Sequence, residues 1–164
     1  MKFTLLTHQK EHLRADNSGA LLAQINDFET DKLLWQRTQP DEALVAAIES
    51  GEAVLLAQHG DGEQLTDINN IDHLIILDGT WQEARKIYNK SGYLKQAKWF
   101  SFEQSTPSRY NLRRNQVAGG LCTAECAIEV LKLKGLDGSA DKLAGLFEDF
   151  LGSAKPNTQY NPPK

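Results

Sequence analysis

The sequence is poor in the residues that define several large classes of protein. It has two cysteines, Cys122 and Cys126, one methionine and five prolines in 164 residues. Two cysteines four positions apart on a predicted helix are badly placed to bond to each other, so we expect a reducing, cytoplasmic compartment. No apolar run approaches the roughly 20 residues that a membrane span requires, and the apolar stretch near the N-terminus is too short for a signal peptide.

Motifs of common nucleotide-binding and hydrolytic enzymes are absent as well. The sequence contains no G-x-G-x-x-G, no Walker loop and no G-x-S-x-G, which argues against a Rossmann dinucleotide site, a P-loop and a serine hydrolase. We expect no metal, because the cysteine pair lacks the second pair of a structural zinc site. Nor is there a metal-site spacing among the four histidines, which are His8, His12, His59 and His73.

What the sequence does have is an uneven distribution of charge. The formal net charge is −4, yet residues 79–118 carry +6 and the remainder carries −10. The basic residues of this segment are Arg85, Lys86, Lys90, Lys95, Lys98, Arg109, Arg113 and Arg114. An acidic protein with one basic face is able to bind a phosphate backbone. The alternative is a solvated surface on which cations cluster by chance.

Apolar patterning predicts alternating strands and helices. Strands are expected at residues 2–8, 31–37, 52–59, 72–78 and 97–102, and helices at 17–28, 40–51, 79–94, 121–135 and 139–155. Several strands are apolar on both faces, which is typical of a parallel sheet that is covered on both sides. We therefore predict one α/β domain with a mostly parallel sheet flanked by helices, over residues 1–154, and a loose tail at 155–164.

Asp78 ends the strand predicted at 72–78, and ligands of open α/β sheets bind beyond the carboxyl ends of strands. A carboxylate in this position is able to accept a proton, bind a sugar hydroxyl or meet a cation, but it also fits a simple helix cap. Gly79 permits a tight turn or the close approach of a ligand, and Thr80 is a second candidate cap. Trp81 falls in the first helical turn, where we expect a core residue or, alternatively, one that packs on a flat ring.

The long loop at 105–120 combines cationic and aromatic side chains that suit phosphates and bases. They are Arg109, Tyr110, Arg113 and Arg114. The loop ends in two glycines before a helix, whose free N–H groups form a candidate anion site. Thr123 and Glu125 lie in the first turn of that helix, although Glu125 also fits an interaction with the helix dipole alone.

Four blocks of the sequence resemble, in order, the signatures of the DTW-domain family. They are THQKEHLRADNSGALL (7–22), LDGTWQEARK (77–86), PSRYNLRR (107–114) and GGLCTAECAIEVL (119–131). The second resembles the D-x-T-W motif, the third an S-x-Y-x-L-R pattern, and the resemblance spans about Leu5 to Leu151. The sequence departs from the family at Ser18, Ala20 and Cys126, where Thr, Arg and Ala are usual, and it lacks the N-terminal cysteine cluster of many relatives.

The resemblance implies a tRNA-uridine aminocarboxypropyltransferase. Such enzymes move the 3-amino-3-carboxypropyl group of S-adenosylmethionine, a co-substrate, to N3 of a uridine in tRNA and release 5′-methylthioadenosine. The implied fold is SPOUT-like, an α/β sheet with a C-terminal trefoil knot. The alternatives are a SPOUT-type RNA methyltransferase, a catalytically inactive RNA-binding relative, and a DTW-like enzyme that acts on another RNA.

The family motifs, together with strand-end position, assign candidate roles to individual residues. Asp78 is the candidate catalytic group, which takes or relays the N3 proton or orients the cofactor. The candidate cofactor-binding residues are Leu77, Gly79, Thr80, Trp81, Leu112, Gly120, Leu121, Thr123 and Glu125. The candidate RNA-binding residues are Asn17, Gly19, Arg85, Lys86, Arg109, Tyr110, Arg113 and Arg114.

Overall fold

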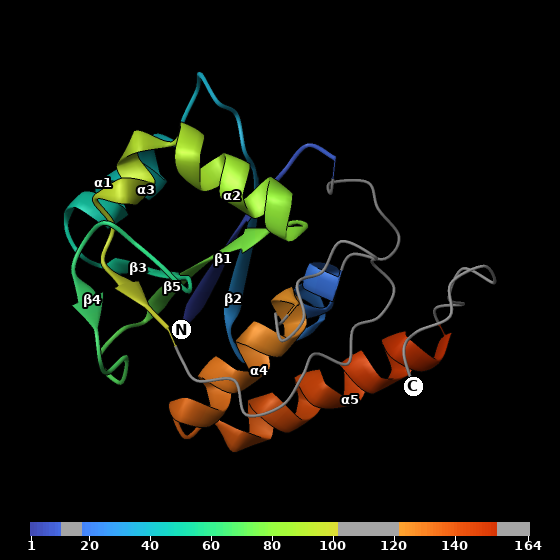
Figure 1. The fold of residues 1–164 in the computed structure, drawn as a ribbon. Coiled ribbons are helices and arrows are strands. Elements are labelled where there is room, and N and C mark those ends of the chain that lie inside the picture. The colour runs from blue at the N-terminus through green and yellow to red at the C-terminus, as the bar shows by residue number, and fades with distance from the viewer. Residues whose placement is uncertain (11–17, 102–121, 154–164) are drawn as a thin grey trace.

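The computed structural model describes residues 1–10, 18–101 and 122–153 and has an α/β fold (Figure 1). The strands are β1 (Lys2–Thr7), β2 (Glu29–Leu34), β3 (Ala53–Leu56), β4 (Gln64–Leu65), β5 (His73–Asp78) and β6 (Trp99–Phe100). The helices are η1 (Ser18–Gln24), α1 (Glu42–Glu49), α2 (Trp81–Lys90), α3 (Gly92–Lys95), α4 (Thr123–Leu133) and α5 (Asp137–Ser153). The strands form one sheet in the order β2-β1-β5-β3-β6-β4, and every pairing is parallel. The predicted α/β class and parallel sheet are confirmed.

The sheet is covered on both faces. Successive side chains of a strand point to opposite sides of a sheet, and in the central strands both sets are buried. Leu5 of β1 joins one buried cluster and Leu6 joins another, and the same alternation separates Ile76 from Ile75 on β5. One face is covered by η1, α4 and α5, and the other by α1, α2 and α3 (Figure 1). Burial on both faces explains why the central strands are continuous apolar runs in the sequence.

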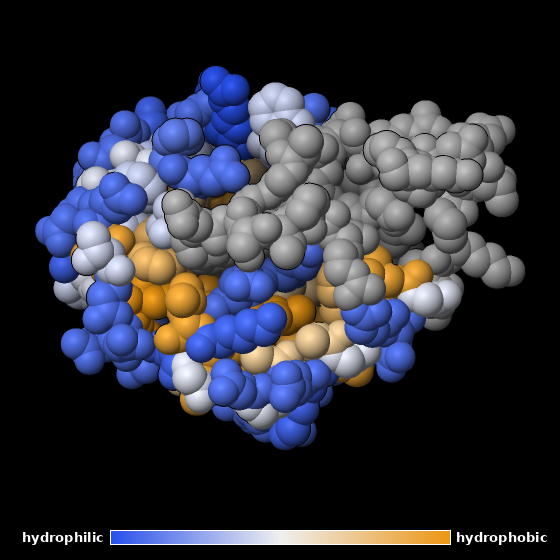
Figure 2. Space-filling view, turned by 60° about the horizontal axis from the view of Figure 1, so that its bottom comes forward, coloured by the Kyte–Doolittle hydropathy of each residue, from blue (hydrophilic) through white to orange (hydrophobic). Residues whose placement is uncertain are grey.

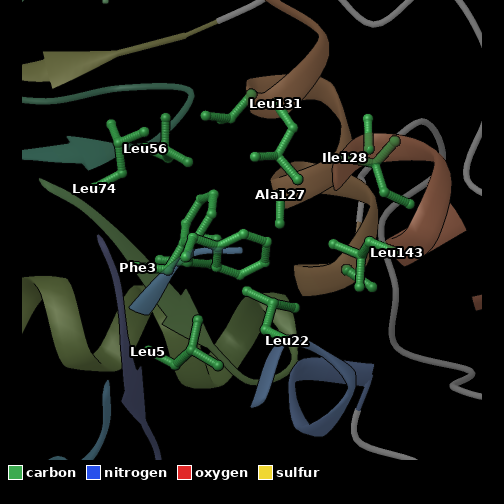
Figure 3. Close-up of a cluster of buried hydrophobic side chains, with 14 of the residues drawn as sticks. Phe3, Leu5, Leu22, Leu56, Leu74, Ala127, Ile128, Leu131 and Leu143 are labelled. Carbon is green, nitrogen blue, oxygen red and sulfur yellow. The ribbon is translucent and has the colours of Figure 1, made fainter. Parts of the chain in front are cut away.

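The cluster under α4 and α5 is the larger of the two. Figure 3 shows side chains of β1, β3, β5, η1, α4 and α5 meeting there, among them Phe3, Leu5, Leu22, Leu56, Leu74, Ala127, Ile128, Leu131 and Leu143. Phe3 also meets Phe28 edge to face, with ring centroids 5.2 Å apart. Figure 2 brings this side of the molecule forward and shows apolar surface in the middle of it, with hydrophilic residues along its lower border. In the described ranges, no helix is long and apolar enough to cross a membrane.

Helix α4 is tied to the sheet beyond its own last turn. It ends in a Schellman motif: Gly135 has φ +75° and donates to Lys132 O, and Leu136 N donates to Leu131 O over 2.8 Å. The ammonium group of Lys134 then donates to three backbone carbonyls of the segment before β5. These are the carbonyls of Ile68, Asn69 and Ile71, at 2.9, 3.2 and 2.6 Å.

Several details differ from the predictions. Residues 18–24 form a 3-10 helix rather than an α-helix. The stretch at 60–70, for which neither a strand nor a helix is predicted, contains the short strand β4. The last helix begins at Asp137, two residues before the predicted start, and the Ser139 hydroxyl donates to Asp27 Oδ2 over 2.9 Å. These differences reflect tertiary contacts that a local pattern does not contain.

Candidate functional site

The carboxyl ends of β1 and β5 lie at the switch point of the sheet, which we call the crevice because open α/β sheets usually bind ligands at such a point. The two strands are neighbours and parallel. The chain leaves β1 for η1 on one face of the sheet and leaves β5 for α2 on the other (Figure 1). Neighbouring strands whose connections run to opposite faces leave an opening between them, which is the usual ligand position in open parallel sheets.

Asp78 lies at the end of β5 in this crevice and is 2% exposed. Thr123, the first residue of α4, donates its hydroxyl to Asp78 Oδ1 over 2.7 Å. Thr7 is the register partner of Asp78 on β1. Its hydroxyl oxygen lies 3.4 Å from Asp78 Oδ2 and 3.2 Å from Leu5 O. The single hydroxyl proton of Thr7 is shared between these acceptors, so Thr123 is the stronger partner. The carboxylate also lies at the positive end of the α4 dipole, where a negative charge is stabilised.

The start of α2 is fixed by a capping box directly after Asp78. Thr80 N donates to Glu83 Oε1 over 2.9 Å, and Glu83 N donates to the Thr80 hydroxyl over 3.2 Å. Both side chains are buried. The predicted capping role of Thr80 is confirmed, and Glu83, the only acidic residue of α2, is turned inward.

The start of α4 is held by two further polar contacts. Cys122 N donates to Glu125 Oε1 over 3.1 Å, and Ala124 N donates to the Ser18 hydroxyl over 3.2 Å. Glu125 therefore does more than face the helix dipole. Burial raises the pKa of the Cys122 thiol well above its ordinary value and raises the pKa of Cys126 to about 12. Both thiols stay protonated at neutral pH, so neither is a ready nucleophile.

His8 completes the crevice from the β1 side. Its backbone N–H donates to Asp78 O over 3.2 Å, and its Nδ1 lies 3.7 Å from Glu83 Oε2. The buried imidazole stacks on Trp35, with ring centroids 5.8 Å apart. Sequence reasoning missed His8 and Thr7 as site residues. Their places depend on strand register with a segment about 70 positions away, although both residues begin the family block at 7–22, which was a signal available in the sequence.

The remaining described candidates lie at the end of β5 and along α2. Trp81 is 43% exposed, so the expectation that it lies in the core was wrong. Arg85 and Lys86 are exposed on α2, and Leu77 and Gly79 are half-buried.

One further candidate lies beside the start of α4, and the rest fall outside the described residues. Gly19 is buried in the first turn of η1, beside Ser18. The other candidates lie outside the described residues: Asn17, Arg109, Tyr110, Leu112, Arg113, Arg114, Gly120 and Leu121. Among the described residues, no group of three or more His, Cys, Asp or Glu side chains is arranged to hold a metal ion.

The fold and this crevice define an α/β protein with a polar, carboxylate-containing site at the switch point of a parallel sheet. The sequence matches the DTW domain over residues 1–154, and the chain belongs to the DTW-domain family. No solved structure gives a significant match. Family membership is consistent with a function in tRNA modification.

Proposed function

We propose that this protein is a tRNA-uridine aminocarboxypropyltransferase. It transfers the 3-amino-3-carboxypropyl group of S-adenosylmethionine to N3 of a uridine in tRNA and releases 5′-methylthioadenosine. The observation that supports this function is the buried Asp78 carboxylate at the switch point, within the family motif and in contact with the first residue of α4. We further propose that the protein acts in the cytoplasm.

The proposed reaction is a substitution at carbon. The bond between uridine N3 and the γ-carbon of the aminocarboxypropyl arm forms, while the bond between that carbon and the sulfonium sulfur breaks. The sulfur keeps the electron pair and becomes a neutral thioether. The proton of N3 passes to a base, because the neutral nitrogen is a poor nucleophile.

Asp78 is able to serve this reaction in two ways. It accepts the N3 proton, or its negative charge holds the sulfonium or the ammonium group of the arm in place. The contact from Thr123 orients the carboxylate in either case, since it fixes Oδ1 at 2.7 Å. The two roles differ kinetically. Loss of a base lowers kcat, whereas loss of an orienting charge also raises KM for S-adenosylmethionine.

The residues around the crevice suit an adenosyl group. Backbone groups of Leu77 to Thr80 span the end of β5, and Thr123 of α4 contacts the Asp78 side chain there. Selective transfer of the arm requires that the methyl group is buried and the γ-carbon faces the nucleophile, so selectivity is a matter of positioning. We also propose a SPOUT-like arrangement with a C-terminal trefoil knot.

The direct test is incubation of the pure protein with S-adenosylmethionine and bulk tRNA from cells that lack it, followed by mass spectrometry of both products. Methylthioadenosine and a uridine heavier by one aminocarboxypropyl group are expected. S-adenosylhomocysteine with methylated RNA would identify a methyltransferase instead. Absence of any product, with RNA binding intact, would identify a binding protein or an enzyme with another acceptor.

A further inference from the structure

The three tryptophans of the chain are in two different environments. Trp35 and Trp99 are each 9% exposed, and each indole N–H has a protein acceptor: Ser91 Oγ at 2.8 Å and Gly62 O at 2.9 Å. Trp81 is 43% exposed. Within the described residues, its indole has neither a hydrogen bond nor a ring contact. A large aromatic side chain left open beside a candidate site is typical of a stacking surface.

Trp81 begins a continuous exposed face of α2. The residues of this face recur at helical spacing, and they are Trp81, Gln82, Arg85, Lys86, Asn89 and Lys90. The face runs about 13 Å along the helix, from the crevice outward, at about 1.5 Å per residue. We call it the α2 face. Ile87 and Glu83 lie on the opposite, buried side of the helix.

The α2 face is positively charged. Arg85, Lys86 and Lys90 are exposed, and within the described part of the chain none of them has an ion pair with a carboxylate. The acid of the helix itself, Glu83, is buried in the capping box. Asp61 lies on the flank, where it accepts a hydrogen bond of 2.8 Å from the Tyr88 hydroxyl. Three exposed cations on a protein of net charge −4 make this face complementary to a polyanion.

We propose that the α2 face is an RNA-docking surface on which Trp81 stacks against an unpaired base next to the acceptor uridine. Arg85, Lys86 and Lys90 contact phosphates of the same strand. An aromatic platform that continues into a row of cations is the usual design of a single-strand binding surface. This inference rests on the proposed function, because RNA is the occupant. In this proposal Trp81 contacts an RNA base, whereas the family motif suggests that it contacts the cofactor.

The test compares RNA affinity with cofactor affinity in two variants of Trp81. Wild type, Trp81→Ala and Trp81→Phe are titrated with tRNA and, separately, with methylthioadenosine. Trp81→Ala is expected to weaken tRNA binding about 5- to 150-fold, the usual cost of one lost stacking contact, and to leave methylthioadenosine binding unchanged. Trp81→Phe keeps an aromatic platform and most of the affinity. Wild-type tryptophan fluorescence is expected to be quenched by tRNA, and this quenching is lost in Trp81→Phe.

The cations are tested by salt dependence. The triple variant Arg85→Ala, Lys86→Ala and Lys90→Ala is expected to reduce the slope of log K against log salt by about 2 to 3. The matched control replaces three lysines elsewhere, Lys2, Lys132 and Lys142, which removes the same net charge and should leave the slope nearly unchanged. An equal change in both triple variants would show a general charge effect and overturn the proposal.

Two other results would also overturn the proposed docking surface. One is unchanged tRNA affinity in Trp81→Ala. The other is a loss confined to methylthioadenosine binding, which would make Trp81 a cofactor-binding residue. Failure of the proposed enzyme activity can be distinguished from failure of the proposed docking surface. A wild-type protein that binds tRNA through Trp81 but forms no methylthioadenosine would retain the docking surface and lose the enzyme activity. A protein that turns over normally with Trp81→Ala would retain the activity and lose the docking surface.

Discussion

The two ends of strand β5 each place a titratable side chain beside a threonine of β1, but the surroundings differ. At the amino end, His73 Nε2 lies 2.6 Å from the Thr4 hydroxyl, and the imidazole is half-buried. At the carboxyl end, Asp78 is 2% exposed and meets Thr7 and, more closely, Thr123 of α4. The first contact joins two strands, whereas the second joins the sheet to the start of a helix.

This difference separates a structural contact from a candidate site. Parallel strands direct all their carboxyl ends to one edge, and the helices that follow begin there with free N–H groups. The capping boxes of α2 and α4 both lie at this edge. The amino end has polar contacts as well, but Lys134 uses its protons on backbone carbonyls of a connecting segment. Chemistry is therefore expected at one end of β5 and stability at the other.

The largest contrast is expected from substitution of the two titratable residues. Asp78→Asn keeps the shape of the side chain and a carbonyl for Thr123, but removes the charge and the capacity to take a proton. Methylthioadenosine formation should fall by about 10²- to 10⁴-fold, whereas His73→Gln should retain most of the activity. Steady-state kinetics with tRNA measure both. Similar turnover in the two variants would remove the distinction between the ends.

A smaller effect is expected when Asp78 is kept but loses its contact with Thr123. Thr123→Val removes the hydroxyl that donates to Oδ1, and the loss of this buried hydrogen bond typically costs about 1–3 kcal/mol of unfolding free energy. Thr123→Ser is the matched control, because it keeps the hydroxyl. Urea unfolding and turnover are measured on both. If valine and serine behave alike, the 2.7 Å contact does not orient the carboxylate.

The capping box of α2 should contribute less. Thr80→Ala removes the acceptor for Glu83 N and should lower the unfolding free energy by about 0.5–2 kcal/mol. Asp41→Ala at the start of α1 is the control, since it removes a comparable cap, with Leu44 N at 2.9 Å, from a helix that does not follow β5. Both variants should lose stability, and only Thr80→Ala should lose activity as well. Equal activity in the two would assign Thr80 to stability alone.

The smallest effect is a pH dependence at the amino end. Burial, followed by the charge of Lys2, lowers the pKa of His73 below its ordinary value of 6.5. The folded state therefore resists protonation. The resulting stability is fully present above pH 6.5 and is lost as pH falls through the folded pKa. Urea unfolding of wild type and His73→Gln between pH 7 and pH 5 measures this, and the two curves should diverge below pH 6.5. Parallel curves would contradict the shift.

The sequence predicts the main strands of the sheet but not the side-chain contacts at the crevice. The strands at 2–8 and 72–78 were predicted to within a residue, because burial on both faces leaves an apolar run of the right length. The two-residue strand at 64–65 has no such run, and it exists because Gln64 and Leu65 pair with β6. The 3-10 geometry of 18–24 likewise follows from packing against α4 and α5, which a helical spacing does not encode.

The site was predicted where motif and strand end coincide. Asp78 and Thr123 were proposed from family blocks 45 positions apart, and the structure brings their side chains together. Thr7 and His8 were missed as site residues, because their contact with the end of β5 arises from the register of two strands. Trp81 was expected in the core because its side chain is large and apolar. It is exposed because α2 turns a different side, that of Glu83 and Ile87, toward the sheet.

Helix α4 is attached to both ends of the strand that it covers. Thr123 reaches the carboxyl end of β5, and Lys134 reaches the segment that leads into its amino end. The 11-residue helix is about 16 Å long and the six-residue strand about 20 Å. Deleting one residue from α4 would turn one end by about 100° and draw it in by about 1.5 Å, so one attachment would be lost. The length of α4 is thus set by β5, and changes of chain length should be tolerated in the exposed connection at 36–40 before they are tolerated in this helix.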